Sequence, residues 1–337
     1  MTSLAPSDIT HYPVMLKEVI ELCELKKGGN FIDCTFGGGN YSSEILKSNN
    51  TKVIALDRDK FVEKKAIKLK EKYENRFTFF HEKFSNIDQV VNKNLKIDKI
   101  IMDLGVSSFQ LKDMSRVFSF NSEDRLDMSM GLSSISAEDV VNDYEEKDLK
   151  LIIKTFGDEK DTSRIVKNII KERQINRIST VKDLVRIIEK SKKKNYSTKI
   201  NISTKTFQAL RIFVNKETTE LLEAIIKASQ IVKSGGKIII VSFHSIEDRI
   251  VNFFFTNYSS NRSKPSRYEP CNDEEHLILF NDYKKNLIRP SKEEIEKNPS
   301  SRSAKLRFVT RNEKNFSYPK SLKIKFKKYI DIEKINA

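Results

Sequence analysis

One stretch near the N-terminus constrains the fold of this chain more than any other. Residues 30–42 read Asn-Phe-Ile-Asp-Cys-Thr-Phe-Gly-Gly-Gly-Asn-Tyr-Ser, so a strand-like run ends in Asp33, three glycines follow, and a helical pattern begins at Ser42. Glycine lets backbone N–H groups approach a ligand closely, and a helix N-terminus adds a partial positive charge. The dinucleotide fingerprint G-x-G-x-x-G requires glycine where Ser42 stands. Taken alone, the stretch is therefore also compatible with a glycine-rich turn that binds nothing.

The next three predicted strands strengthen the case for a ligand site. Each carries a residue that could contact a ligand at its carboxyl end. Asp57 ends the strand 52–57, Asp103 ends the strand 97–103, and Phe84 lies just beyond the strand 77–81. An acid at the tip of the second strand is where nucleotide-binding sheets hold the two ribose hydroxyls. The alternation of strands and helices through residue 104 indicates an α/β fold with a doubly wound parallel sheet. Its ligand crevice would lie at the carboxyl ends of the strands.

The composition favours a polyanionic partner. The 337 residues include 62 Lys and Arg against 47 Asp and Glu, for a formal net charge of +15. This balance favours nucleic acid, although a genome that encodes lysine freely would produce the same excess. The three cysteines have no C-x-x-C spacing and the four histidines form no cluster, so we expect neither a disulfide framework nor a metal site. No apolar run approaches the roughly 18 residues of a membrane span, and we expect a cytoplasmic protein.

The alternation of strands and helices is interrupted once, and this interruption divides the chain into segments. Residues 109–130 have no clean period and predict a long ordered loop. Helical patterns without an intervening strand follow, and the α/β pattern returns at Thr204. We expect a first sheet segment over residues 1–130 and a helical insertion that recognises the substrate over 131–203. A second sheet segment over 204–311 and a basic tail over 312–337 follow.

The second half of the chain carries further expectations. A long helix over 217–232 is predicted to stop at Ser234-Gly235-Gly236, because glycine commonly ends helices. A strand over 237–242 follows, and a last strand over 304–310 is expected to pair with it antiparallel. Residues 259–302 are weakly patterned and predict a mobile loop that could order on RNA. The tail contains an alternating stretch over 322–326.

This order of elements favours methyl transfer over hydride transfer. An antiparallel last strand that follows a helix is the arrangement of class I S-adenosylmethionine-dependent methyltransferases rather than of nicotinamide dehydrogenases. S-adenosylmethionine has no pyrophosphate, so the third glycine of the dinucleotide fingerprint is not needed. Residues 103–108, Asp-Leu-Gly-Val-Ser-Ser, stand where such enzymes face the methyl acceptor.

Motifs along most of the chain resemble those of the bacterial ribosomal RNA small subunit methyltransferase H family. They are His11-Tyr-Pro-Val, Asp33-Cys-Thr-Phe-Gly, Ala55-Leu-Asp-Arg-Asp, Asp103-Leu-Gly-Val-Ser-Ser, Phe118-Ser-Phe, Leu126-Asp-Met, Thr206-Phe-Gln-Ala-Leu-Arg-Ile, Val214-Asn and Ser242-Phe-His-Ser-Ile-Glu-Asp-Arg. The resemblance covers residues 11–311 and includes an inserted helical domain. It implies S-adenosylmethionine as cofactor and N4-methylation of a cytidine in the decoding centre of 16S rRNA, in the small ribosomal subunit.

The resemblance also implies a set of cofactor contacts. Carried over by position, they fall on Gly39, Asn40, Tyr41, Asp57, Phe84, Asp103 and Gln110. The family's loop reads T-F-G-x-G-G followed by His or Tyr, so Asn40 replaces the second glycine of the pair. We expect the loop to keep its function, because asparagine tolerates the left-handed region or adopts a negative φ. Physical chemistry assigns the ribose hydroxyls to Asp57 and the adenine face to Phe84, which is otherwise a core aromatic.

An exocyclic amine is a poor nucleophile because its lone pair is delocalised into the ring. Catalysis is therefore expected to come from positioning and from polar groups that stabilise developing charge, with the base exposed or flipped into the pocket. Asp103 is the catalytic candidate, and no general base can be named. Further candidates on the acceptor side are Ser107, Ser108, Asp127, Arg211 and His244.

Two other functions remain open at the level of sequence. A DNA amino-methyltransferase would carry a D-P-P-Y-like motif at the fourth strand, where this chain has Leu104-Gly-Val-Ser. A non-catalytic RNA-binding ribosome assembly factor that kept the fold would bind the cofactor without turnover.

Overall fold

Six strands form one mixed sheet in this computed structural model, in the order β3-β2-β1-β4-β5-β6. The structure describes residues 13–92, 94–105, 124–192, 201–261, 277–284 and 287–336. The strands are β1 Gly29–Asp33, β2 Thr51–Asp57, β3 Phe77–His81, β4 Ile97–Asp103, β5 Val232–Ser242 and β6 Lys305–Thr310. The pairings from β3 to β5 are parallel, and β6 pairs antiparallel with β5. The predicted class I methyltransferase architecture is confirmed.

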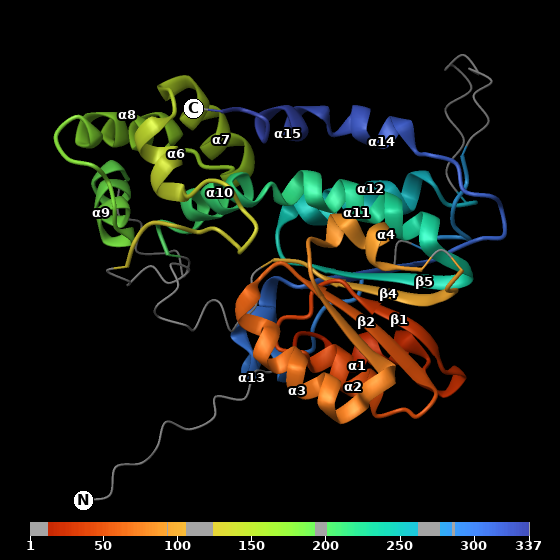
Figure 1. The fold of residues 1–337 in the computed structure, drawn as a ribbon. Helices are drawn as coiled ribbons and strands as arrows, with labels where there is room; N and C mark the ends of the chain where they lie inside the picture. The colour runs from red at the N-terminus through yellow and green to blue at the C-terminus, as the bar shows by residue number, and fades with distance from the viewer. Residues whose placement is uncertain are drawn as a thin grey trace, which may run out of the picture.

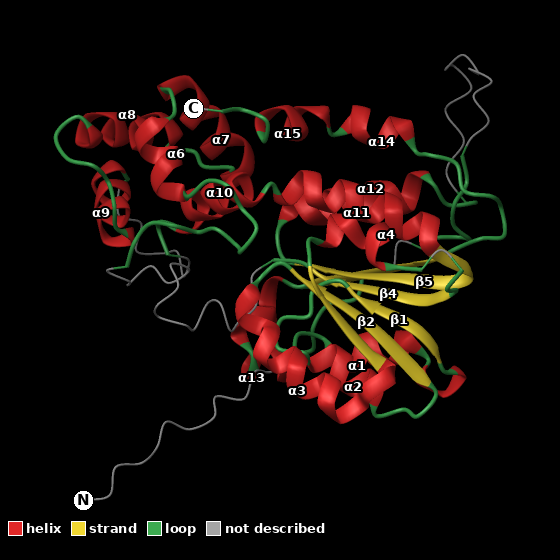
Figure 2. Cartoon of the chain, viewed as in Figure 1, coloured by secondary structure: helices red, strands yellow, loops and turns green. Residues whose placement is uncertain are grey.

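Helices cover both faces of this sheet, as Figure 1 and Figure 2 show. On one face lie α1 Leu16–Cys23, α2 Asn40–Leu46 and α3 Glu63–Tyr73, and on the other lie α4 Ile87–Val90, α11 Glu217–Ile231 and α12 Ser245–Asn257. The strands alternate between these faces with the period of two that a pleated sheet imposes. Ile100 and Ile238 join one buried cluster, whereas Ile101 and Ile239 join the other. The central strands are thus apolar on both sides, as parallel sheets require.

A group of helices lies beside the sheet, between β4 and α11 in sequence (Figure 1). It comprises α6 Ala137–Asp143, α7 Glu146–Gly157, α8 Thr162–Arg173, α9 Val181–Ser191 and α10 Thr204–Asn215. Helix α10 packs against α7 and α6. At the close contact of α10 with α7, a side chain at Gly157 would lie 2.4 Å from the carbonyl oxygen of Lys205. Helix α10 thus belongs to the packing of this group.

The C-terminal segment crosses the molecule as two short helices, α14 Lys320–Lys325 and α15 Lys327–Ile332. Figure 1 shows it running along α11 and α12 towards the helical group. Leu322 and Phe326 are buried and lie four residues apart, which is the spacing of one helical face. The alternating pattern of 322–326 therefore does not produce an extended segment.

Three other expectations about local structure were wrong. Helix α2 begins at Asn40 rather than Ser42, because Gly39 takes the left-handed φ of 75° at its N-cap. Helix α11 ends at Ile231, and β5 continues through Gly235 and Gly236 with a register shift against β4. In the described part of 259–302, helix α13 Lys292–Lys297 and the 3-10 turn Pro299–Ser303 replace the expected mobile loop.

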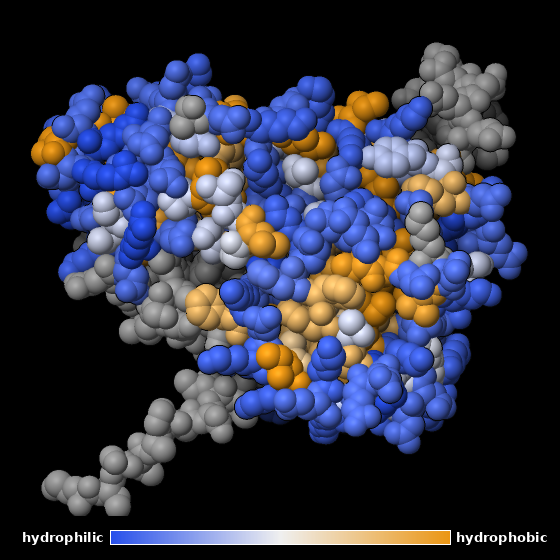
Figure 3. Space-filling model, viewed as in Figure 1, coloured by the Kyte–Doolittle hydropathy of each residue, from blue (hydrophilic) through white to orange (hydrophobic). Residues whose placement is uncertain are grey.

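The face of the molecule in Figure 3 is unevenly polar. The helical group and the C-terminal helices are mostly hydrophilic, with single exposed apolar side chains such as Ile175 and Ile324, whereas apolar residues gather below α4 and α11 over the strands. Among the described residues, no helix has both the length and the apolar character needed to cross a membrane.

Candidate functional site

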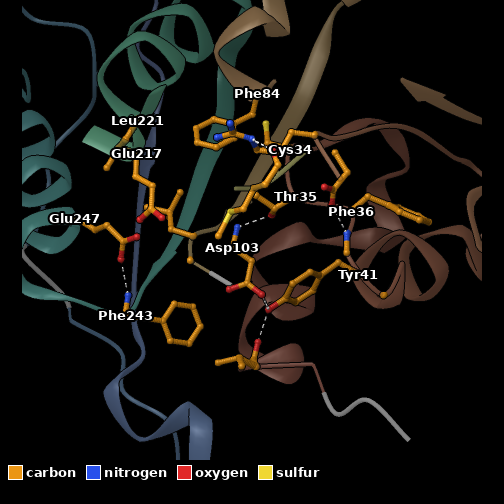
Figure 4. Close-up of a pocket in the computed structure, with 18 of the residues that line it drawn as sticks. Cys34, Thr35, Phe36, Tyr41, Phe84, Asp103, Glu217, Leu221, Phe243 and Glu247 are labelled. Carbon is orange, nitrogen blue, oxygen red and sulfur yellow. Dashed lines mark hydrogen bonds between the residues drawn. The ribbon is translucent and has the colours of Figure 1, made fainter. Parts of the chain in front are cut away.

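A cavity of about 400 Å³ opens at the carboxyl ends of the parallel strands. It is bounded by the glycine loop, the tips of β2 and β4, the start of α11 and the start of α12. Ser300 and Ser303, from the 3-10 turn after α13, line it as well. Figure 4 shows Asp103 and Tyr41 pointing towards one another, with Phe84 and Leu221 on the opposite wall and Phe243 and Glu247 beside them.

The glycine loop has a shape that only glycine permits at Gly39. The Gly39 N–H donates to the carbonyl oxygen of Phe36 at 2.6 Å, and a β-carbon at Gly39 would lie 2.7 Å from the Phe36 ring. The Phe36 N–H in turn donates to the carbonyl oxygen of Leu56, which ties the loop to β2. Asn40 begins α2 with helical geometry, so the family's second glycine is not needed for a left-handed conformation there.

Asp57 at the tip of β2 is held by backbone donors. Its Oδ2 accepts the N–H of Gly37 at 2.7 Å, and its Oδ1 accepts the N–H of Asp59 at 2.8 Å. Burial raises the pKa of Asp57 to about 6, against the effect of these two hydrogen bonds. A carboxylate oxygen has a second lone pair, so each oxygen retains capacity for one ligand hydroxyl.

Asp103 at the tip of β4 has an unpartnered oxygen. Its N–H donates to Thr35 Oγ1 at 2.7 Å, and its Oδ2 lies 3.5 Å from the Tyr41 hydroxyl. Its Oδ1 is buried without a hydrogen-bond partner among the described residues. Burial raises the pKa of Asp103 well above its usual range, and the negative charges of Asp33 and Glu247 add to the effect. A buried carboxyl oxygen without a donor is costly, so this position suits a ligand that donates a hydrogen bond.

Four charged residues form an ion-pair network at one side of the cavity, where Arg211, Glu217 and Glu247 line it and His244 does not. Arg211 Nε lies 2.9 Å from Glu217 Oε1, and His244 Nε2 lies 3.1 Å from Glu247 Oε1. Glu247 Oε2 also accepts the N–H of Phe243 at 2.8 Å and that of His244 at 3.2 Å, and the latter bond belongs to the capping box that starts α12. Burial alone would lower the pKa of His244, but the carboxylates of Glu247 and Glu217 outweigh it and raise the pKa to about 9.

The positive and negative charges of this network compensate one another. Glu217, His244 and Glu247 are close enough together to resemble a metal-ligand set. However, the two carboxylates face two cationic partners, Arg211 and a His244 that is protonated at neutral pH. A metal cation would have to displace these partners, so the set is better described as a buried ion-pair network.

A loop that follows the undescribed segment 106–123 is fastened under the cavity. The side chain of Asn215 at the end of α10 accepts the N–H of Met130 at 2.8 Å and donates to the carbonyl oxygen of Met128 at 2.9 Å. Arg58, just beyond β2, donates to the carbonyl oxygen of Met130 at 2.7 Å. Met130 itself lines the cavity, so these bonds set part of its floor.

Six of the twelve candidate site residues named from the sequence line this cavity. Those that line it are Asn40, Tyr41, Asp57, Phe84, Asp103 and Arg211. Gly39 shapes the loop from behind, and His244 lies behind Glu217 and Glu247. Asp127 is not among the lining residues, and its Oδ1 accepts the N–H of Ser129 at 3.3 Å. Ser107, Ser108 and Gln110 lie outside the described residues.

Sequence reasoning missed the part that α11 plays in the site. Glu217, Glu220 and Leu221, all from its first turns, line the cavity. Acids in the first turn of a helix are ordinary N-terminal residues, because they complement the helix dipole. Nothing local distinguishes Glu217 from such a residue, and the sequence therefore held no signal for its place in the site.

The fold and the cavity together define the class of protein. The sheet order, the antiparallel last strand, the glycine loop after β1 and the acid at the end of β2 are those of a class I methyltransferase, whose cofactor is S-adenosylmethionine. The residues fit this cofactor, because the cavity offers a hydroxyl acceptor at Asp57, an aromatic wall at Phe84 and an unpartnered acceptor at Asp103.

Comparison with known proteins places the chain within this class. The model of the MraW methylase family matches residues 8–312, and the chain belongs to that family. It is similar to proteins named ribosomal RNA small subunit methyltransferase H, with 42% identity to that of Ehrlichia canis and 41% to that of Sulfurihydrogenibium sp.. These alignments cover 89% of this chain and 99% and 98% of the relatives. A solved rRNA methylase from Streptococcus thermophilus aligns over 90% of this chain and 99% of its own, with 12% identity and a TM-score of 0.40.

Proposed function

We propose that this protein transfers a methyl group from S-adenosylmethionine to N4 of a cytidine in the decoding centre of 16S rRNA, within the small ribosomal subunit. The observation that carries the proposal is the unpartnered, buried Oδ1 of Asp103 at the cavity. An exocyclic amine must donate its N–H groups to acceptors while its lone pair faces the methyl group. Family membership and the names of the relatives support ribosomal RNA as the substrate.

The cofactor would be held from three sides. Asp57 accepts the ribose hydroxyls, Phe84 packs on the adenine, and the loop from Gly37 to Tyr41 surrounds the methionine portion. Gln110, which the family resemblance also implies, lies outside the described residues and stays a prediction. When bound, S-adenosylmethionine supplies an electrophilic methyl group on its sulfonium.

The chain's own residues position the acceptor. Asp103 holds an amine, either that of the target base or that of the methionine portion, through Oδ1. Glu217, Glu247 and Phe243 bound the space next to it, and Arg211 and His244 keep those two carboxylates compensated. The base leaves its stack to reach this space. Rate enhancement then comes chiefly from orientation and from polar groups that stabilise developing charge, and no general base is assigned.

Each segment of the chain has its own part in this proposal. In this proposal the helical insertion, residues 131–203, recognises the folded RNA beside the cavity, while 1–130 and 204–311 build the catalytic part and 312–337 the tail. The net charge of +15 suits a phosphate-rich surface. Ser107, Ser108 and Asp127 remain predicted acceptor-side residues, and the protein is expected to act in the cytoplasm.

The test is transfer of labelled methyl from S-adenosylmethionine to small subunits that lack their native methylation, with naked 16S rRNA, short oligonucleotides and duplex DNA in parallel. Nucleoside analysis is expected to find the label in N4-methylcytidine on subunits. Asp103→Asn is expected to lower the rate by about a hundredfold or more, since it alters the group nearest the acceptor. Glu63→Gln, exposed at the start of α3, is the matched control.

Three outcomes would contradict the proposal. Label in DNA would indicate a DNA amino-methyltransferase. Cofactor binding with no label in any substrate would indicate an assembly factor. Equal labelling of short oligonucleotides and subunits would refute recognition of a folded ribosomal surface.

A further inference from the structure

Helix α11 lacks a cap of its own at the end that borders the cavity. Its N-cap residue, Lys216, has a left-handed φ of 50° and makes no side-chain cap hydrogen bond. A lysine ammonium has no acceptor, so it cannot satisfy the free N–H groups of the first turn. The free N–H groups of that turn include those of Thr218 and Thr219, the second and third residues of the helix.

Glu333, near the end of the chain, supplies the missing cap. Its Oε1 accepts the Thr218 N–H at 2.9 Å, and its Oε2 accepts the Thr219 N–H at 2.8 Å and the Thr219 hydroxyl at 2.5 Å. These are the two backbone donors that a Ser or Asp at the N-cap would satisfy. Glu333 is only 2% exposed, and its carboxylate faces the positive end of the helix dipole. The cap therefore comes from more than one hundred residues away in sequence.

The element that carries Glu333 is itself held in place. Phe326 packs edge-on against Phe253 of α12, and Tyr329 accepts a hydrogen bond from Arg249 at 2.8 Å. Ile332, immediately before Glu333, is 3% exposed. Helix α15 contacts α11 and α7, so it joins the sheet portion to the helical group. Residues 313–337 lie beyond the 8–312 that the family model matches.

The capped end of α11 is the end that forms the site. Glu217 directly precedes the two capped residues and lines the cavity, as do Glu220 and Leu221 one turn later. Glu217 also pairs with Arg211. A shift or fraying of this first turn would move the wall that faces Asp103, and displacements of about 1 Å at such a wall are enough to slow a reaction.

We propose that Glu333 is a positioning residue for methyl transfer, which caps α11 from the C-terminal tail and so holds Glu217, Glu220 and Leu221 at the cavity. The proposal rests on the proposed function, because the wall that Glu333 holds is the one assigned to the acceptor. It gives the tail a structural part in catalysis that is separate from binding RNA through its lysines.

The experiment compares Glu333→Gln with the full-length wild-type protein. Gln keeps the size of the side chain, but one of its two acceptors becomes a donor that faces a backbone N–H. We expect kcat with small subunits to fall by about tenfold while the Kd of S-adenosylmethionine changes by less than about threefold. Thr219→Val removes only the hydroxyl hydrogen bond and is expected to give a smaller loss in the same direction. Asp331→Asn, a change at an exposed residue of α15 that pairs with Lys327, is expected to match wild type.

Hydrogen exchange provides a readout that does not depend on activity. In Glu333→Gln, the amides of 218–221 are expected to exchange about tenfold faster, with the amides of α12 unchanged. Unchanged exchange at 218–221 would overturn the cap, and faster exchange with unchanged kcat would overturn its part in positioning. A wild-type protein that binds the cofactor but methylates nothing would instead overturn the proposed function, together with the catalytic half of this inference.

Discussion

Asp57 and Asp103 both end strands of the sheet, yet their surroundings prepare them for different partners. Asp57 already accepts a backbone N–H on each oxygen, which fixes the orientation of the carboxylate. Asp103 has an oxygen without any donor among the described residues. In the proposed function, Asp57 is a rigid acceptor for a second hydrogen bond, and Asp103 offers a free acceptor to an amine. Residue type and strand position alone do not separate these two roles.

The affinity for S-adenosylmethionine should depend on the ionisation of Asp57. Because burial raises its pKa to about 6, the carboxylate is ionised at neutral pH and becomes protonated as the pH falls through 6. A protonated group is the weaker acceptor for ribose hydroxyls. We expect the Kd, measured by calorimetry between pH 8 and pH 5, to be flat above 7 and to rise below 6.

Asp57→Asn tests the assignment. It should weaken binding at pH 8 by roughly tenfold or more, because a hydrogen bond to a charged acceptor is lost, and it should abolish the pH dependence. Glu63→Gln on exposed α3 should leave both the affinity and its pH profile as in wild type. A pH dependence that persists in Asp57→Asn would assign it to another group.

At the scale of elements, Asn215 is the joint between the helical group and the sheet. Its side chain bonds to the backbone at Met130 and Met128 and also accepts from the Ser133 hydroxyl at 2.8 Å. Next to it, a β-carbon at Gly131 would lie 1.9 Å from the carbonyl oxygen of Arg58. The loop at Gly131 therefore packs directly against the backbone just beyond β2. These contacts set the relation of α10 to the cavity floor.

Asn215→Ala should lower the free energy of unfolding by roughly 2 to 4 kcal/mol, because buried backbone donors and acceptors lose their partners. Urea denaturation monitored by circular dichroism measures this change. Asn176→Ala, at an exposed position after α8, should change stability by less than about 0.5 kcal/mol. A loss below about 1 kcal/mol for Asn215→Ala would show that the joint is held by apolar packing instead.

At the scale of the whole molecule, net charge and the shape of the cavity are expected to contribute to recognition in different ways. The cavity wall is internally balanced, with Arg211 and His244 against Glu217 and Glu247, so the excess of positive charge lies elsewhere. A net charge of +15 draws a phosphate-rich partner over long distances but does not choose a base. Base choice therefore falls to the cavity and to the elements around it.

The affinity for small subunits should fall steeply with salt, by roughly a hundredfold between 50 and 200 mM, because bound counterions are released from several phosphates. Filter binding at several salt concentrations measures the slope. The affinity for S-adenosylmethionine is the internal control, since it binds within a buried cavity and should change little over the same range. Salt-independent binding of subunits would show that phosphate contacts contribute little.

Much of this protein follows from patterns that neighbouring residues create. The strand tips at Asp57 and Asp103, the glycine turn before α2 and the antiparallel last strand are all readable in the sequence, because each depends on period, turn chemistry or order along the chain. Motif resemblance likewise pointed to the methyltransferase family and its cofactor. Such features can be predicted without knowledge of long-range contacts.

Other features depend on packing between distant segments. Glu217 reads as an ordinary first-turn acid until α11 is docked against the sheet, and Glu333 reads as one more charge in a basic tail until α15 lies across α11. The segment after residue 259 looks unpatterned, yet Glu294 of α13 accepts the Met15 N–H at 2.7 Å and so joins α13 to the start of α1. Hydrogen bonds and burial between residues more than a hundred positions apart leave no local period, so only the tertiary structure decides them.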